Sequence, residues 1–138
     1  MTKEGLFQFI QGHKLGVLST ISDSTTPQSA LMGIAVTPGL EIIFDTLKTS
    51  RKYPNLISNP RCSLVIGWAG EVTVQFEGEA RELAGTELPK YKQIYFQTWP
   101  DCLTHESWPG IVYFGVRPNW IRYSDFDRNP PLIEEFRF

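Results

Sequence analysis

A cluster of hydroxyl and basic side chains between residues 46 and 52 is the clearest candidate for chemistry in this sequence. Thr46, Ser50, Arg51 and Lys52 follow the apolar run "LEIIF" and precede a short segment with helical apolar spacing. Hydroxyl groups donate hydrogen bonds, a guanidinium can bind two phosphate oxygens at once, and lysine adds a point charge. With Ser50 as the N-cap, the unpaired N–H groups of a helix start would lie beside them. The cluster predicts an anion site, with a solvated basic turn as the alternative.

The elements that would position this cluster are mostly strands. Strand patterns and turn signals are found at 15–22, 28–36, 40–46, 62–69, 71–83, 110–116 and 119–126, the last two separated at Arg117-Pro118. Helical spacing occurs at about 2–13, 50–59 and 87–98. The first three strands have links too short for parallel crossovers, so they predict an antiparallel meander. We therefore expect a mainly β (α+β) fold, a small antiparallel barrel of six or seven strands with peripheral helices.

The segment after residue 126 shows no clear regular structure. Its sequence is "DRNPPLIEEFRF", and its apolar side chains are Leu132, Ile133, Phe136 and Phe138. We expect these apolar residues to dock on a partner.

Length and composition limit the class of protein. A chain of 138 residues predicts one domain, spanning 1–138. Its 13 basic and 15 acidic residues give no footprint for nucleic acid, and no apolar run has the roughly 20 residues of a membrane span. The only cysteines, Cys62 and Cys102, cannot form a disulfide framework, so a reducing compartment, the cytoplasm, is expected. Together with His13 and His105 they do not form the ligand pattern of a structural zinc site, so no metal is expected.

His105 is the other polar residue of interest, in the segment "DCLTHESWPG". It could donate a proton or act as an axial ligand of haem, but a solvated loop histidine is the favoured interpretation. The chain shows no Gly-rich phosphate loop and no Ser/His/Asp arrangement, so no catalytic residue is assigned.

The order of these segments resembles the pyridoxamine 5'-phosphate oxidase-like family. The similarity lies in the strands "LGVLSTIS", "PQSALMGIAV" and "LEIIFDT", followed by "KTSRKYPNLISNPRCSLVIGW" and "VTVQFEGEAREL", and it covers about residues 5–126. The resemblance implies an FMN-binding split β-barrel that forms a homodimer, with two FMN molecules at the subunit interface.

The resemblance also implies roles for particular residues. Arg51 and Lys52 would bind the FMN phosphate, assisted by Ser50 and Thr46. Asp45 would lie beside the ribityl chain or the ring edge, and Ser29, Ala30 and Leu31 would run along the isoalloxazine. Thr73 stands where the biosynthetic oxidases carry a glutamine that contacts the flavin. Trp99 and Trp120 would cover the flavin from the partner chain, with core packing or the dimer seam as the alternative.

Two departures from the biosynthetic oxidases concern the substrate. Ala30 stands where they have an arginine that contacts the phosphate, and this chain lacks their Arg-Leu-His-type segment near the end. Pyridoxamine phosphate is therefore not the expected substrate. The expected function is an FMN-dependent oxidoreductase with a reduced nicotinamide or a small molecule as donor. The alternatives are a non-catalytic flavin store or redox sensor, and a haem- or deazaflavin-binding relative.

Overall fold

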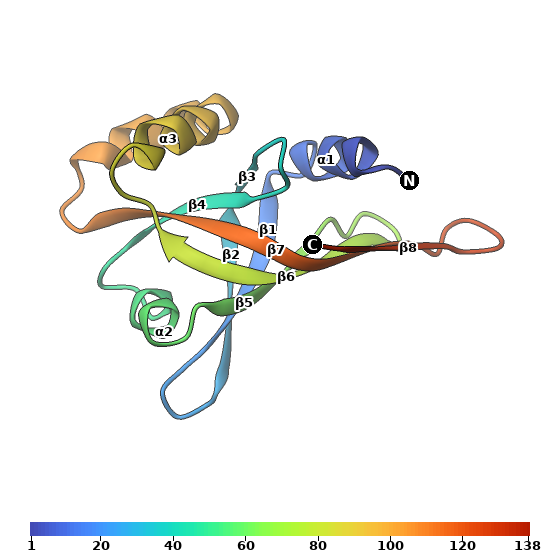
Figure 1. Cartoon of the computed structure of the whole chain (residues 1–138), viewed down its shortest axis with the longest axis horizontal. Coiled ribbons are helices and arrows are strands. Elements are labelled where there is room, and N and C mark those ends of the chain that lie inside the picture. Colours follow the sequence, from blue (N-terminus) through green and yellow to red (C-terminus); the bar gives the residue numbers. More distant parts are fainter.

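The computed structural model describes every residue from Met1 to Phe138. Three α-helices, one 3-10 helix (η1) and eight strands follow one another along the chain (Figure 1). Their order is α1 (Lys3–Gln11), β1 (Leu15–Ile21), β2 (Pro27–Gly33), β3 (Ala35–Val36), β4 (Ile42–Leu47), α2 (Lys52–Ser58), β5 (Arg61–Ile66), β6 (Val72–Glu82), α3 (Glu87–Thr98), η1 (Pro100–Ser107), β7 (Ile111–Asp125) and β8 (Leu132–Arg137). None of the helices combines the length and the apolar character needed to cross a membrane.

The strands form one antiparallel sheet that curls into a barrel. The order across it is β2-β1-β5-β6-β7-β4-β3, and β8 adds to β7. Strands β2 and β3 stand at the two ends of this order, yet only Ile34 separates them along the chain. The chain itself therefore brings the two ends of the sheet together. The predicted α+β split barrel is confirmed, with eight strands rather than six or seven.

The predicted three-strand meander is present in part. β2 pairs with β1, and β4 pairs with β3, the last two residues of the segment predicted as one strand, but β4 does not pair with β2 and its other neighbour is β7. The segment predicted as one strand at 28–36 is interrupted at Ile34, whose N–H donates to the carbonyl of Lys14. This bond extends the contact between β1 and β2 by one residue, and the residues after Ile34 pair at the opposite end of the sheet.

The two strands predicted on either side of Arg117-Pro118 are one strand, β7. Its pairing with β6 shifts register at a bulge between Glu77 and Gly78, opposite this dipeptide. A Cβ atom on Gly78 would lie 2.1 Å from the carbonyl oxygen of Arg117, so the two backbones approach more closely than any side chain permits. The bulge lets the strand continue through a proline, which cannot donate a ladder hydrogen bond.

The tail predicted to lack regular structure forms strand β8, which pairs with the second half of β7. Leu132 and Phe136 pack against the barrel core, whereas Ile133 and Phe138 are exposed. Alternate residues of β8 are less exposed, namely Leu132, Glu134 and Phe136. The strand pattern is hard to recognise in the sequence because the middle one of these three is charged. Only part of the tail's apolar surface therefore remains for a partner.

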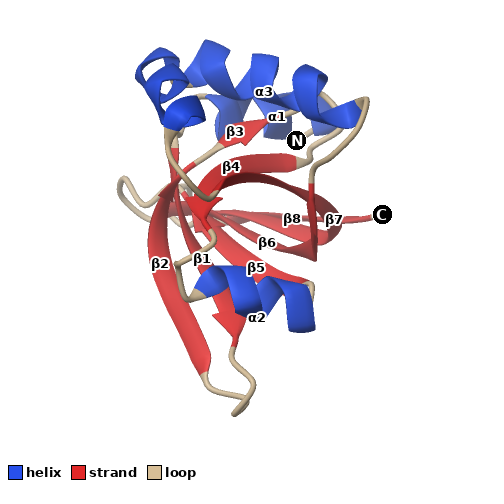
Figure 2. Ribbon diagram, turned by 90° about the vertical axis from the view of Figure 1, so that its left-hand side faces the viewer, coloured by secondary structure: helices blue, strands red, loops and turns tan.

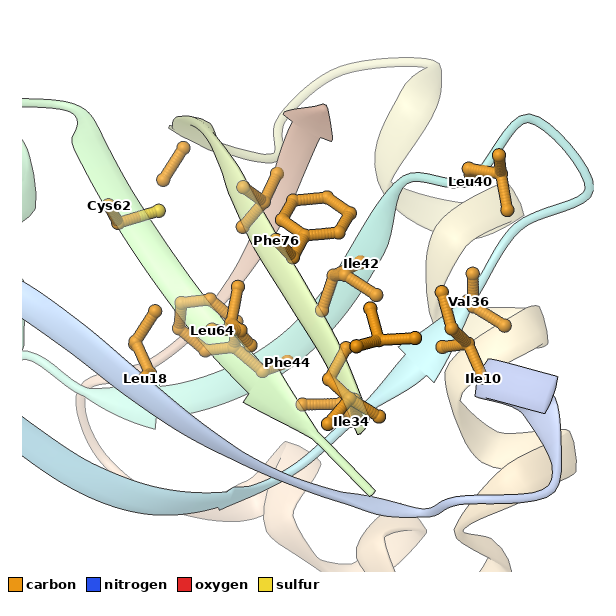
Figure 3. Close-up of a cluster of buried hydrophobic side chains, with 14 of the residues drawn as sticks. Ile10, Leu18, Ile34, Val36, Leu40, Ile42, Phe44, Cys62, Leu64 and Phe76 are labelled. Carbon is orange, nitrogen blue, oxygen red and sulfur yellow. The ribbon is translucent and has the colours of Figure 1, made fainter. Parts of the chain in front are cut away.

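Two apolar clusters lie on opposite faces of β4. Side chains from α1, β1, β4, β5 and β6 point toward one another inside the barrel, among them Ile10, Leu18, Phe44, Leu64 and Phe76 (Figure 3). A smaller cluster packs under α3 and consists of Ala35, Ile43, Leu83, Tyr95 and Tyr113. Figure 2 shows α1 and α3 together at one end of the barrel and α2 at the other. The side chains of β4 therefore face two different environments.

Candidate functional site

A cavity of about 240 Å³ lies between β1, β2 and the start of α2. Its lining residues are Leu18, Thr20, Gln28, Ser29, Ala30, Arg51 and Lys52. The fold thus brings the predicted cations Arg51 and Lys52 together with Ser29 and Ala30, which the sequence places on a separate strand. These are four of the residues expected to contact a flavin.

The cavity is electrostatically suited to an anion. Arg51 and Lys52 take part in none of the ion pairs of the protein. No carboxylate lines the cavity. Burial lowers the pKa of the Lys52 ammonium, because the charged form loses hydration there without gaining a partner. An anion in the cavity would supply that partner for both cations.

Thr46 and Ser50 form a hydrogen-bonded pair near the start of α2. The Thr46 hydroxyl donates to Ser50 Oγ at 2.9 Å, and the Ser50 N–H donates to the carbonyl of Leu47 at 2.9 Å. The expected N-cap role of Ser50 is wrong: α2 begins at Lys52, and its N-cap is Arg51, which makes no side-chain capping bond. The helix has only seven residues. The anion site therefore depends on side chains more than on the helix dipole.

Asn55 is a buried polar residue beside the cavity that the sequence interpretation missed. Its side-chain amide donates to Thr20 Oγ1 at 3.0 Å and to Gln28 Oε1 at 2.9 Å, and the residue is only 6% exposed. These bonds fasten α2 to β1 and β2 at the cavity wall. The available signal was a polar residue beside Leu56, on the side of a short helix that faces the barrel.

Asp45 faces away from the cavity, on the side of β4 covered by α3. Its carboxylate accepts a hydrogen bond from the Tyr95 hydroxyl at 3.2 Å and lies 2.8 Å from His105 Nδ1. The favoured interpretation of His105 as a solvated loop residue is therefore wrong. The residue lies on η1, half-buried, and its ring stacks on Trp108 with the centroids 3.9 Å apart. Pairing with a carboxylate from another element could not be read from the local sequence.

Thr46 and Ser50 do not line the cavity either, and four further predicted residues also lie outside it. Leu31 is 62% exposed on the outer face of β2. Trp99 donates from Nε1 to the carbonyl of Ile34 at 2.9 Å, and Trp120 donates to Glu135 Oε2 at 3.0 Å. The Thr73 hydroxyl donates to the carbonyl of Ile66 at 3.4 Å. Within one copy of the chain, these residues do not join the cations.

Comparison with known proteins identifies the family. The sequence model described as Pyridoxamine 5'-phosphate oxidase matches residues 2–125. The chain belongs to this family. No curated protein sequence matches the chain. The family match extends from the start of α1 to the end of β7 and includes every residue of the cavity, so the predicted resemblance is confirmed.

Solved structures share the fold at low sequence identity. A heme-binding protein from Mycobacterium smegmatis superposes with a TM-score of 0.84 at 15% identity, over 99% of this chain and 58% of that chain. The General Stress Protein 26 from Bacillus anthracis superposes with a TM-score of 0.75 at 25% identity, over 99% and 98% of the two chains. HutZ, the heme storage protein from Vibrio cholerae, superposes with a TM-score of 0.74 at 14% identity, over 86% and 91%. The chain thus spans less than two thirds of the length of the mycobacterial protein.

Proposed function

We propose that this protein binds FMN and acts as an FMN-dependent oxidoreductase, with Arg51 and Lys52 holding the phosphate. The observation that carries the proposal is the pair of cations without ion-pair partners in a cavity that no carboxylate lines. Membership of the pyridoxamine 5'-phosphate oxidase family supports a flavin as the phosphate-bearing ligand. Thr46 would act indirectly, by orienting the Ser50 hydroxyl.

The size of the cavity suits one end of the cofactor. A volume of about 240 Å³ is below the range of roughly 300–1,000 Å³ that encloses a drug-sized ligand. It accommodates the phosphate and the first part of the ribityl chain, so the ring would extend past Ala30 along β2. FMN, when bound, supplies hydride and electron transfer. The residues of this chain would bind and orient it.

The polar groups at the cavity suit redox chemistry better than hydrolysis. Among its lining residues only Arg51 and Lys52 are ionisable, and no carboxylate, histidine or cysteine lines the cavity to serve as a general acid or base. We propose a reduced nicotinamide or another small hydride donor rather than pyridoxamine phosphate. A flavin store or redox sensor without turnover is the second possibility. Turnover of NADH or NADPH with an added acceptor favours the enzyme, and its absence in FMN-loaded protein favours the store.

A homodimer is part of the proposal, because the outer face of the barrel carries an apolar row. Leu31 pairs across the sheet with Val17, which pairs with Val65, and these neighbours share one face. Leu31 is 62% exposed and Val65 is 42% exposed. A second copy covering this row would bury it beside the predicted position of the flavin ring. Sedimentation should give a dimer at micromolar concentration, and Leu31→Glu should weaken it by placing a charge in the interface.

Haem is the second candidate ligand, because the mycobacterial protein with the same fold binds heme. His105 is the candidate axial ligand, and its Nδ1 lies 2.8 Å from the carboxylate of Asp45. It lies outside the cavity that contains the two unpaired cations, so flavin is the favoured ligand. The absorption spectrum of the purified protein separates a Soret band from flavin bands.

Titration of FMN against the apoprotein tests the phosphate assignment. We expect Arg51→Ala with Lys52→Ala to weaken FMN binding by at least about a hundredfold, because charge-assisted hydrogen bonds contribute roughly 1.5–3 kcal/mol each. Lys48→Ala is the matched control, since Lys48 belongs to the same basic segment but does not line the cavity. Riboflavin, which lacks the phosphate, should bind the double variant and the native protein alike. Unchanged FMN affinity in the double variant would refute the assignment.

A further inference from the structure

Three groups with metal-ligating atoms meet on the α3 side of β4, on the face opposite Thr46. They are the carboxylate of Asp45, the thiol of Cys102 and the imidazole of His105, whose ligand atoms all lie within 4.8 Å of one another. Each residue is half-buried. None of them lines the cavity that holds Arg51 and Lys52.

The secondary structure explains how these residues meet. Cys102 and His105 are three positions apart on the 3-10 helix η1. A 3-10 helix has three residues per turn, so side chains at this spacing lie on the same face. Asp45 faces them from β4, and the Tyr95 hydroxyl links Asp45 Oδ1 at 3.2 Å with Cys102 Sγ at 3.9 Å. Two candidate ligands that are close in sequence, Cys102 and His105, therefore meet a third, Asp45, from a distant part of the chain.

Tyr113 provides an independent indication that a ligand belongs here. It pairs directly with Asp45 across β4 and β7, so the two side chains share one face of the sheet. Tyr113 is only 4% exposed, and its hydroxyl has no hydrogen-bond partner. Leaving such a group unpaired costs about 1–3 kcal/mol. Burial and the neighbouring charges of Asp45 and Glu106 raise the pKa of Tyr113 to about 12, so the hydroxyl stays protonated and available.

We propose that Asp45, Cys102 and His105 bind a divalent transition-metal ion, Zn²⁺ in first place, with the Tyr113 hydroxyl beside its fourth coordination position. One thiolate, one imidazole and one carboxylate form a donor set that zinc accepts. Metal–ligand bonds of roughly 2.0–2.3 Å require tetrahedral ligand atoms about 3.3–3.6 Å apart. The present separations, from 2.8 Å between Asp45 and His105 to at most 4.8 Å, reach this spacing by shifts of about 1 Å.

The charges around the cluster favour a cation. Asp101 and Glu106 lie on the same 3-10 helix as Cys102 and His105. The ammonium of Lys92 lies 5.1 Å from the centroid of the Tyr113 ring, and it is already paired with Glu106. Binding through Cys102 forms a sulfur–metal bond from a sulfur lone pair and releases the thiol proton to solvent.

Titration of metal-free protein with Co²⁺ tests the site, because cobalt reports thiolate ligation in its spectrum. We expect one Co²⁺ per chain, with a thiolate-to-cobalt charge-transfer band that added Zn²⁺ removes. Cys102→Ser should abolish this band, and His105→Gln should weaken binding at least tenfold.

The chain offers matched controls for both ligand types. Cys62→Ser and His13→Gln change the only other cysteine and histidine and should leave the cobalt spectrum intact. A native protein without the charge-transfer band would overturn the proposal, whatever the variants do. A band that survives Cys102→Ser, or that Cys62→Ser removes, would overturn it as well. FMN affinity is measured separately on the same proteins, so failure of this site is distinguishable from failure of the flavin site.

Discussion

Asp45 and Thr46 are consecutive residues of β4 whose side chains lie on opposite faces of the sheet. Thr46 donates to Ser50 near the cavity with the two cations, whereas Asp45 pairs with Tyr95 and His105 under α3. The alternation of a β-strand therefore assigns neighbouring residues to two separate sites. Substitutions at these positions should have separable effects.

The first prediction uses this separation. Thr46→Val keeps the shape of the side chain but removes the hydrogen bond that orients Ser50. A hydrogen bond of this kind contributes about 1 kcal/mol, so FMN affinity should fall about fivefold. Asp45→Asn should leave FMN affinity within about twofold, because its carboxylate does not line the cavity. Fluorescence titration of FMN measures both. A large loss in Asp45→Asn alone would place the flavin on the α3 side of β4.

The second prediction concerns the pH dependence of FMN binding. Burial lowers the pKa of Lys52 below the ordinary value of lysine in the protein without FMN, and a bound phosphate would raise this pKa again by favouring the ammonium. The affinity for FMN should therefore be highest at pH values below the lowered pKa of Lys52, and it should fall as the pH rises through this pKa. Affinity should also fall below about pH 6, where a phosphate monoester gains its second proton.

Lys52→Arg is the control for this pH profile. Its guanidinium stays charged, so the alkaline fall in FMN affinity should move to higher pH while the acidic fall stays in place. Titrations of native protein and variant from pH 5 to pH 10 measure the difference. Identical alkaline limbs would show that Lys52 does not carry the effect.

The third prediction concerns Asn55. Asn55→Ala leaves the buried Thr20 hydroxyl and the Gln28 amide oxygen without this donor, so the free energy of unfolding should fall by about 1–3 kcal/mol. FMN affinity should fall as well, because α2 carries Lys52 and would no longer be fastened to β1 and β2. Urea unfolding and FMN titration measure the two effects. Asn119→Ala, at an exposed position, is the control and should change stability by less than about 0.5 kcal/mol.

Local signals in the sequence predicted much of this architecture. The apolar run before Thr46, the basic cluster and the Asn-Pro end of α2 are contiguous, and they predicted the strand, the helix and the anion site between them. Arg51 and Lys52 indeed meet Ser29 and Ala30 in one cavity. The position of this cavity followed from the family resemblance rather than from the spacing of the residues.

Long-range pairings were beyond such signals. Thr20, Gln28 and Asn55 form one hydrogen-bonded group only after α2 packs on β1 and β2. The spacing of Cys102 and His105 becomes meaningful only once η1 presents both residues to Asp45 on β4. Strand pairing depends on the whole sheet, so the break at Ile34 and the pairing of β4 with β7 were not predicted.

The last prediction tests the bulge that allows β7 to pass through Pro118. Gly78→Ala would place a methyl group 2.1 Å from the carbonyl oxygen of Arg117, and a backbone atom cannot rotate away as a side chain can. The two strands must separate or shift, so we expect the free energy of unfolding to fall by about 2–4 kcal/mol. Gly39→Ala is the matched control, because the nearest atom to its new methyl group is Thr37 Oγ1 at 3.8 Å. Equal unfolding midpoints for the two variants in urea would contradict the close approach of β6 and β7.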